Sequence, residues 1–80
     1  MTSEVLRAGA RGEPVRDLQM RLASAGFASK DPSGVYAVET ENSVRQFQES
    51  RRIRVDGICG PQTWASLVES GRVLGDRLLS

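Results

Sequence analysis

The sequence contains no histidine and a single cysteine, Cys59, among its 80 residues. Without histidine the chain has no paired ligand set for zinc and lacks the most common general base. One cysteine cannot form an internal disulfide. No histidine or lysine stands nearby in the sequence to lower its pKa, so we expect Cys59 to be a small, partly buried apolar residue. The sequence therefore predicts no catalytic residues, no bound metal and no cofactor.

The sequence also lacks any apolar run near the roughly 20 residues that a membrane-spanning helix needs. Its first residues, Met1 to Glu4, carry no basic region followed by an apolar core, so we expect no secretory signal. Eleven basic and ten acidic residues leave a net charge of +1, which supplies no strong field for a polyanion. With 39% hydrophobic and 26% charged residues, the composition is that of one small soluble globular domain.

What the sequence does contain is a motif used twice. Residues 34–40 read GVYAVET and residues 57–63 read GICGPQT, and the two align residue for residue at an offset of 23 positions. Each copy leads into helical periodicity, with an apolar residue, Val44 or Leu67, four positions after its threonine. We call these segments the first corner and the second corner, because their glycines permit tight turns and each segment leads into a helix.

Apolar spacing, with proline near helix starts and glycine near helix ends, predicts three helices. They run from residues 12–14 to Gly26, from Val38 or Glu39 to about Arg51, and from residues 60–61 to Gly71. The residues expected to face the core are Val15, Leu18, Leu22, Ala25, Val44, Phe47, Trp64, Leu67 and Val68. The predicted fold is all-α, a compact three-helix bundle with short Gly-rich connecting loops, and any strand content is confined to short loop pairings.

The predicted domain covers residues 12–71. Residues 1–11 form a polar N-terminal segment, and residues 72–80 form a C-terminal tail or linker, with a further turn of helix as the alternative. Within the domain, Gln19 and Gln48 end matching patterns, VRDLQ and VRQFQ, beside the apolar stripe. We predict that both glutamines hydrogen-bond loop backbone that would otherwise be buried without a partner, and direct ligand contact is the alternative.

Several motifs carry a family resemblance from about Leu6 to Val68. They are GARG at 9–12, VRDLQ at 15–19, Leu22, GF at 26–27, GVY at 34–36, Thr40, Val44, FQ at 47–48, VDGI at 55–58, GP at 60–61, TW at 63–64 and Leu67. In this order they resemble the peptidoglycan-binding-like domains of bacterial cell-wall enzymes. The resemblance implies a three-helix accessory module without catalytic activity, joined to a catalytic domain such as an N-acetylmuramoyl-L-alanine amidase.

The residues 73–79, VLGDRLL, are similar to the segment that follows the first of two tandem copies in a group of bacterial amidases. This implies an N-terminal module of such an amidase. The implied partners are a peptidoglycan glycan strand or stem peptide, the linked catalytic domain and a second tandem copy, with neither nucleic acid nor membrane. An exported parent would work in the cell wall or outside the cell, and a cytoplasmic parent stays open.

The junction of the two corners is the candidate ligand site. A glycan strand with short peptides presents hydroxyls, acetamido groups and carboxylates, which suit a shallow groove with an aromatic face and arginine or amide donors. The candidate residues are Tyr36, Arg54, Asp56, Gly57, Gln62 and Trp64. A structural role is the alternative for each of them, above all for Trp64, which is at helical spacing with core residues.

Two other functions are compatible with the same features. The module could dock a protein partner or regulate its enzyme instead of holding wall polymer, since a fold does not fix a function. Three short helices can also form a helix-turn-helix, and four arginines, Arg45, Arg51, Arg52 and Arg54, gather near the end of the second predicted helix. Interspersed glutamates and the net charge of +1 argue against DNA binding.

Overall fold

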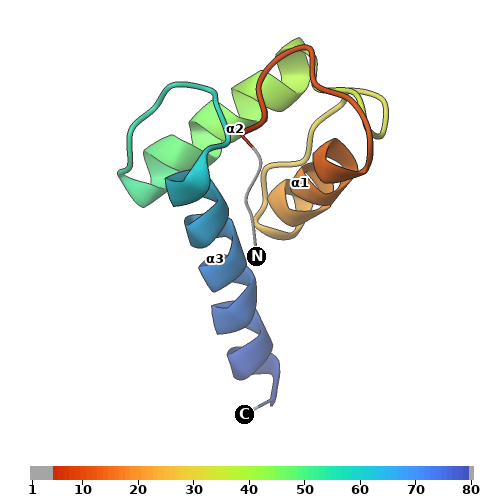
Figure 1. Ribbon diagram of the computed structural model, residues 1–80. Coiled ribbons are helices and arrows are strands. Elements are labelled where there is room, and N and C mark those ends of the chain that lie inside the picture. The colour runs from red at the N-terminus through yellow and green to blue at the C-terminus, as the bar shows by residue number, and fades with distance from the viewer. Residues whose placement is uncertain (1–4, 80) are drawn as a thin grey trace.

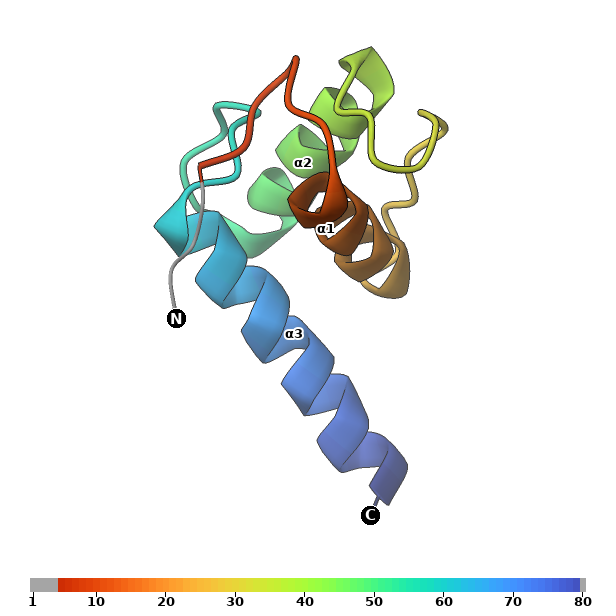
Figure 2. The same cartoon turned by 45° about the vertical axis from the view of Figure 1, so that its right-hand side comes forward.

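The computed structural model describes the backbone of residues 5–79 and the side chains of residues 5–71. It contains three helices, α1 (Glu13–Ser24), α2 (Val38–Arg51) and α3 (Pro61–Leu79). Helix α2 crosses the N-terminal end of α3, and α1 packs against both of the other helices (Figures 1 and 2). Strand-like pairing in the described residues consists of two isolated antiparallel bridges, so the predicted all-α three-helix fold is confirmed. None of the helices in this part of the chain is long and apolar enough to cross a membrane.

Helix α1 follows the predicted pattern. Pro14 lies in its first turn, and Val15, Leu18 and Leu22 are buried along one face. The helix ends at Ser24, and Gly26 follows its C-cap, Ala25, with a φ of 98° in the left-handed region that glycine tolerates best. The Phe27 N–H donates to the Leu22 carbonyl at 2.8 Å, which turns the Phe27 ring back onto the core as predicted.

Helix α2 has an unusually polar buried face. Besides Val44 and Phe47 it buries Thr40, Ser43 and Gln48, which explains why its apolar stripe is thin in the sequence. The Phe47 ring packs edge-on against Phe27, with ring centroids 6.1 Å apart. The polar residues of this face are all hydrogen-bonded, which offsets the free-energy cost of burying them.

The start of α2 is capped from a distance by Asp31. Its Oδ2 atom accepts hydrogen bonds from the backbone N–H groups of Ala37 at 2.9 Å and Thr40 at 2.7 Å. The first N–H groups of a helix have no partners inside the helix, so a carboxylate there both satisfies them and favours the helix dipole. Partial desolvation raises the pKa of Asp31, but the hydrogen bonds to Thr40 and Ala37 outweigh it and leave the pKa lowered.

This cap makes stability sensitive to acid. Because the pKa of Asp31 is lowered in the fold, its contribution is complete above the unfolded value of about 3.9 and is lost as the pH falls through the lower folded value. In the unaltered chain we expect the midpoint of urea unfolding to drop steeply as the pH falls from the unfolded pKa of Asp31 through its lower folded pKa. In Asp31→Asn, which keeps an acceptor oxygen but cannot titrate, the drop should be smaller. Equal acid sensitivity of the two proteins would show that Asp31 is not the responsible group.

Helix α3 departs from the prediction at two positions. Leu67 is buried as expected, but Val68 is 45% exposed, because it lies one position round the helix from the face that meets α1. The predicted end at Gly71 is wrong, since α3 continues to Leu79. A glycine ends a helix when it adopts positive φ, and the five glycines that do so are Gly9, Gly12, Gly26, Gly34 and Gly57. Gly71 does not have positive φ and lies within the helix.

The N-terminal segment joins the two corners. Leu6 exchanges both backbone hydrogen bonds with Cys59, at 3.0 and 2.8 Å, and its side chain is only 5% exposed. A few residues later, Gly12 donates to the Gly34 carbonyl at 3.0 Å, beside the bridge between Arg11 and Val35. The described part of this segment is therefore integrated into the domain, and its backbone pairs with the backbone of both corners.

Candidate functional site

The second corner is organised around the side chain of Gln48. Its Oε1 atom accepts the backbone N–H groups of Asp56 at 3.1 Å and Gly57 at 3.0 Å. Its Nε2 group donates to the Ile58 carbonyl and to the Thr63 hydroxyl, each at 3.0 Å, and to the Asp56 carboxylate at 2.9 Å. Gln48 is 1% exposed, so this one amide satisfies a loop that would otherwise bury polar backbone without partners.

Gln19 holds the first corner in the same way. Its Oε1 atom accepts the Gly34 N–H at 2.8 Å, and its Nε2 group donates to the Val35 carbonyl and the Thr40 hydroxyl, each at 3.0 Å. Three partners of each glutamine are related by the 23-residue offset of the sequence repeat, namely Gly34 and Gly57, Val35 and Ile58, and Thr40 and Thr63. The predicted structural role of both glutamines is confirmed. The threonine hydroxyls bond to these amides rather than to loop backbone.

Tyr36 lies in the core and not at the surface. Its ring is 1% exposed and its hydroxyl donates to the Gly57 carbonyl at 2.6 Å, so it fastens the first corner to the second. Burial, with smaller effects from neighbouring acidic groups, raises the pKa of its hydroxyl well above the usual range. Its ring is therefore not available as the aromatic face that we expected it to give to a ligand.

Gly57 is also a structural residue in this geometry. It has a φ of 74° and is buried against α2, where an added Cβ would come within 2.9 Å of Glu41 Cγ and 3.0 Å of Arg45 Nε. Those two side chains pair with each other at 3.6 Å. A Cβ at this position would force the Glu41 and Arg45 side chains or the loop backbone to shift.

Asp56 and Arg54 lie on the outer side of the second corner. The Asp56 Oδ1 atom accepts the Ile58 N–H at 2.9 Å. This bond lowers the pKa of the carboxyl, partial burial opposes the shift, and Gln48 and Arg54 add to the lowering. The Arg54 Nε atom is 3.8 Å from Asp56 Oδ2, and the Arg54 side chain is 85% exposed. Such a loose, exposed pair contributes little to stability and leaves the guanidinium accessible.

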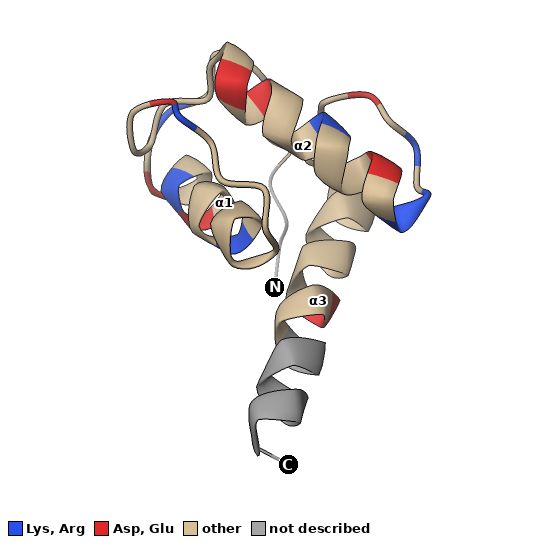
Figure 3. Ribbon diagram, turned by 180° about the vertical axis from the view of Figure 1, so that it is seen from behind, with Lys and Arg blue, Asp and Glu red and all other residues tan. Residues whose placement is uncertain are grey.

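Gln62 and Trp64 complete the exposed part of the predicted site. Gln62 is exposed in the first turn of α3, and Trp64 is half-buried and packs against the core. Gln48 bonds both Asp56 and Thr63, which places the start of α3 beside the loop that carries Arg54. We call Arg54, Asp56, Gln62 and Trp64 the second-corner surface. Figure 3 shows basic and acidic residues interspersed along α2 and the following loop rather than separated by sign.

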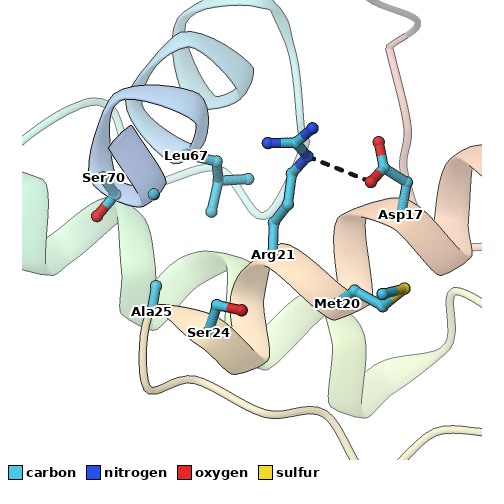
Figure 4. Close-up of a pocket in the computed structure, with 8 residues that line it drawn as sticks. Asp17, Met20, Arg21, Ser24, Ala25, Leu67 and Ser70 are labelled. Carbon is cyan, nitrogen blue, oxygen red and sulfur yellow. Dashed lines mark hydrogen bonds and ion pairs between the residues drawn. The ribbon is translucent and has the colours of Figure 1, made fainter. Parts of the chain in front are cut away.

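A concavity that the sequence did not predict lies between α1 and α3 (Figure 4). It has a volume of about 210 Å³ and is lined by Asp17, Met20, Arg21, Ser24, Ala25, Leu67, Ser70 and Gly71. The lining comes from two helices that are far apart in the chain, so no local motif marks it. Met20, an apolar residue outside the stripe of α1 and 64% exposed, is the one signal that the sequence carries. We call this concavity the α1–α3 groove.

The lone thiol of Cys59 lies inside the core. It is fully buried, and burial raises its pKa to about 12, with a smaller contribution from Asp56. It behaves as the small apolar residue that the sequence predicts, and its burial is complete rather than partial. Within the described residues, no three histidine, cysteine or acidic side chains lie close enough together to hold a metal ion.

Both corners, together with the glutamines that hold them, lie inside the region that a family profile matches. The profile described as "Putative peptidoglycan binding domain" matches residues 11–67. The chain belongs to this family. This assignment favours the peptidoglycan-binding hypothesis over the helix-turn-helix alternative.

Relatives with similar sequences are enzymes of the cell wall and spore cortex. The N-acetylmuramoyl-L-alanine amidase CwlL of Bacillus licheniformis is 40% identical over 72 residues, which cover 88% of this chain and 20% of that protein. A spore cortex-lytic enzyme of Bacillus cereus is 38% identical over 86% of this chain and 27% of that protein. The amidase CwlM of Mycobacterium tuberculosis is 38% identical over 80% and 16%. The chain thus spans 16–27% of the length of these relatives and corresponds to an accessory module within them.

Solved structures give the same result for the fold. The SleB N-terminal domain superposes with a TM-score of 0.81 at 38% identity and covers 86% of this chain and 94% of its own. The Burkholderia AP3 phage endolysin matches with a TM-score of 0.75 at 41% identity, over 80% of this chain and 24% of its own. The domain is therefore a peptidoglycan-binding module of the kind found in cell-wall hydrolases, as the sequence resemblance implied.

Proposed function

We propose that this chain is the wall-binding module of a longer cell-wall hydrolase, and that the parent enzyme is an N-acetylmuramoyl-L-alanine amidase. The observation that carries this proposal is the family match over residues 11–67 together with the amidases among the relatives. The match to an N-terminal domain supports an N-terminal position in the parent. The names of the relatives, which act on wall or cortex, support a parent that works at the cell wall.

The second-corner surface is the proposed contact for the stem peptides or glycan of the wall. Arg54, on the loop that Gln48 holds, and Gln62, in the first turn of α3, are exposed donors on ordered backbone, so they would bind carboxylate or carbonyl oxygens with little loss of backbone freedom. Trp64 adds an apolar flank from the first turns of α3. A shallow surface of this kind favours weak binding by one copy and stronger binding by two tandem copies.

Sedimentation with insoluble peptidoglycan tests this proposal. We expect the purified chain to pellet with the wall polymer in moderate salt. Arg54→Ala should weaken the association by about fivefold, the equivalent of about 1 kcal/mol from one exposed charge-assisted contact. Arg7→Ala, an exposed arginine of the N-terminal segment, is the matched control and should pellet like the unaltered chain.

Two results would contradict the proposal in different ways. If the unaltered chain stays in the supernatant at all salt concentrations while an isolated amidase domain retains it, the module docks protein and does not bind wall polymer. If the chain pellets but Arg54→Ala and Arg7→Ala behave alike, the wall-binding function stands and the second-corner surface is the wrong contact.

A further inference from the structure

The arginines that the sequence gathers near the end of α2 have different surroundings in the structure. Arg45 is paired with Glu41 at 3.6 Å. Arg51, the last residue of α2, and Arg52, its C-cap, are both exposed where the helix meets the following loop (Figure 3). Within the described part of the chain, neither of these two guanidiniums has a hydrogen bond or an ion pair with a carboxylate. We call Arg51 and Arg52 the α2 arginine pair.

Arg52 occupies a backbone position that usually belongs to glycine. Its φ of 59° and ψ of 36° are left-handed, and among the described residues it alone has positive φ without being a glycine. Its N–H donates to the Glu49 carbonyl and the Ile53 N–H to the Gln48 carbonyl, each at 3.1 Å, which are the two bonds of a Schellman motif. The motif requires the left-handed backbone, but it does not require an arginine side chain. A residue that breaks a local rule without a compensating contact in the domain favours a role in binding.

Arg51 is positioned by an aromatic ring rather than by a carboxylate. Its guanidinium carbon lies 5.8 Å from the centroid of the Phe47 ring. Attraction to the ring restricts the side chain and leaves its N–H donors free for another molecule. A cation in the last turn also interacts favourably with the helix dipole, which gives Arg51 a stabilising role but does not account for the strained backbone of Arg52. The pair therefore presents two uncompensated guanidiniums on ordered backbone.

The surroundings of the pair restrict the anion that it can bind. The last carbonyl groups of α2 carry partial negative charge, and Glu49 is exposed one turn before Arg52. A compact anion with several charges would be repelled by these groups, whereas a chain with one charge per unit can contact the ends of the arginine side chains alone. The net charge of +1 adds no long-range attraction, so such binding is weak and depends on local contacts.

Guanidinium groups bind phosphate oxygens as well as carboxylates. The backbone is helical at Arg51 and left-handed at Arg52, so the two side chains leave it in different directions. A tetrahedral phosphodiester accepts hydrogen bonds from several directions, whereas the two oxygens of a planar carboxylate are occupied by one guanidinium fork. Single-stranded nucleic acids also need aromatic faces for stacking, and Phe47, the ring in contact with the pair, is only 1% exposed.

We propose that the α2 arginine pair binds a linear phosphodiester polymer that carries no bases. Arg54 follows two positions after Arg52, and its side chain, which is 85% exposed, adds a third guanidinium toward the second-corner surface. This inference assigns a ligand other than peptidoglycan to the end of α2, and it does not depend on the proposed wall-binding function.

An NMR titration at low salt with three polyanions of equal charge tests this site. The probes are an oligomer of glycerol phosphate, an oligomer of glutamate and an oligothymidylate. We expect the glycerol phosphate oligomer to shift the backbone amide signals of residues 51–54 and to bind most tightly, with an affinity that falls as salt is added. Binding of the glutamate oligomer at equal strength would remove the preference for phosphate, and tighter binding of the oligothymidylate would make the ligand a nucleic acid. Either result would overturn the proposal.

Arg52→Gly separates binding from stability, because the two should change in opposite directions. Glycine relieves the left-handed backbone, so Tm should rise by about 4 °C. Loss of the guanidinium should raise the dissociation constant for the glycerol phosphate oligomer about fivefold. Glu49→Gln removes the neighbouring negative charge and should lower that constant. Arg7→Gln, which removes an exposed charge elsewhere, is the matched control and should leave both Tm and the dissociation constant unchanged.

An Arg52→Gly protein that gains stability and binds the oligomer like the unaltered chain would overturn the proposal. Sedimentation with phosphate-free peptidoglycan measures the wall-binding function separately. If the unaltered chain pellets with that polymer but does not bind the glycerol phosphate oligomer, this inference fails and the wall-binding function stands. If it binds the oligomer through Arg52 but does not pellet, this inference holds and the wall-binding function fails.

Discussion

Replacing Gln48 with alanine is expected to remove a large share of the free energy of unfolding of this domain. The change leaves the Gly57 N–H and the Thr63 hydroxyl buried without their partner, and it also frees the Asp56 N–H and the Ile58 carbonyl. A buried polar group without a partner costs about 1–3 kcal/mol, so we expect a loss of about 3–5 kcal/mol. At about 0.05–0.15 kcal/mol per residue, a chain of 80 residues has only about 4–12 kcal/mol in total.

Urea denaturation followed by circular dichroism measures this loss. Gln46→Ala, two positions earlier on the exposed face of α2, is the control and should change stability by about 0.5 kcal/mol or less. Gln48→Glu separates the two halves of the network, because a carboxylate still accepts the two N–H groups but cannot donate to Ile58 or Thr63. A Gln48→Ala protein within about 1 kcal/mol of the unaltered chain would contradict the role assigned to this amide.

Gly57→Ala should have the second largest effect, through a different mechanism. A φ of 74° costs a residue with a Cβ about 1–2 kcal/mol, and that Cβ would lie 2.9 Å from Glu41 Cγ and 3.0 Å from Arg45 Nε. Together these predict a destabilisation of about 2–4 kcal/mol in thermal or urea unfolding. Adding Glu41→Ala should recover the steric part and leave the cost of the backbone conformation, so the two changes should not be additive.

Gly60→Ala is the matched control in the same corner. Gly60 does not have positive φ, and an added Cβ there would meet nothing within 4 Å. Alanine at such a position is neutral or stabilises by about 0.4–1 kcal/mol, because it reduces the freedom of the unfolded chain. Equal effects of Gly57→Ala and Gly60→Ala would show that the tight approach to α2 is not what the second corner requires.

Much of the fold could be predicted from residues close together in the sequence. The 23-residue repeat gave the two corners, and the matching glutamines gave their interior hydrogen bonds, because each feature repeats a recognisable pattern. The end of α1 also follows from local chemistry, since Gly26 and the apolar Phe27 after it are visible without tertiary information. Helix α2 instead has Arg52 as its C-cap, which adopts a left-handed φ of 59° without a glycine to mark it. The match between Gln19 and Gln48 is the clearest of these successes.

The parts that failed depend on contacts between distant residues. Tyr36 has the same local sequence whether its ring points outward or inward, and only its bond to Gly57, 21 positions away, decides the matter. Asp31 precedes Pro32 in a pattern that is typical of a turn, but its role as a cap depends on how the loop folds back over α2. The candidate site was the part least predictable from the sequence, because Tyr36 is buried and the α1–α3 groove exists only once two helices pack.

The pairing of Leu6 with Cys59 gives the domain a direction of assembly. During synthesis from the N-terminus, residues 9–12 can pair with the first corner soon after it is made, whereas Leu6 has no partner until the chain has grown a further 53 positions. Loop closure over that span is slow compared with helix formation. Until Cys59 emerges, the backbone of Leu6 has no pairing partner and its side chain is uncovered. The second corner, which is synthesised last, is therefore the one that fixes the N-terminal segment in place.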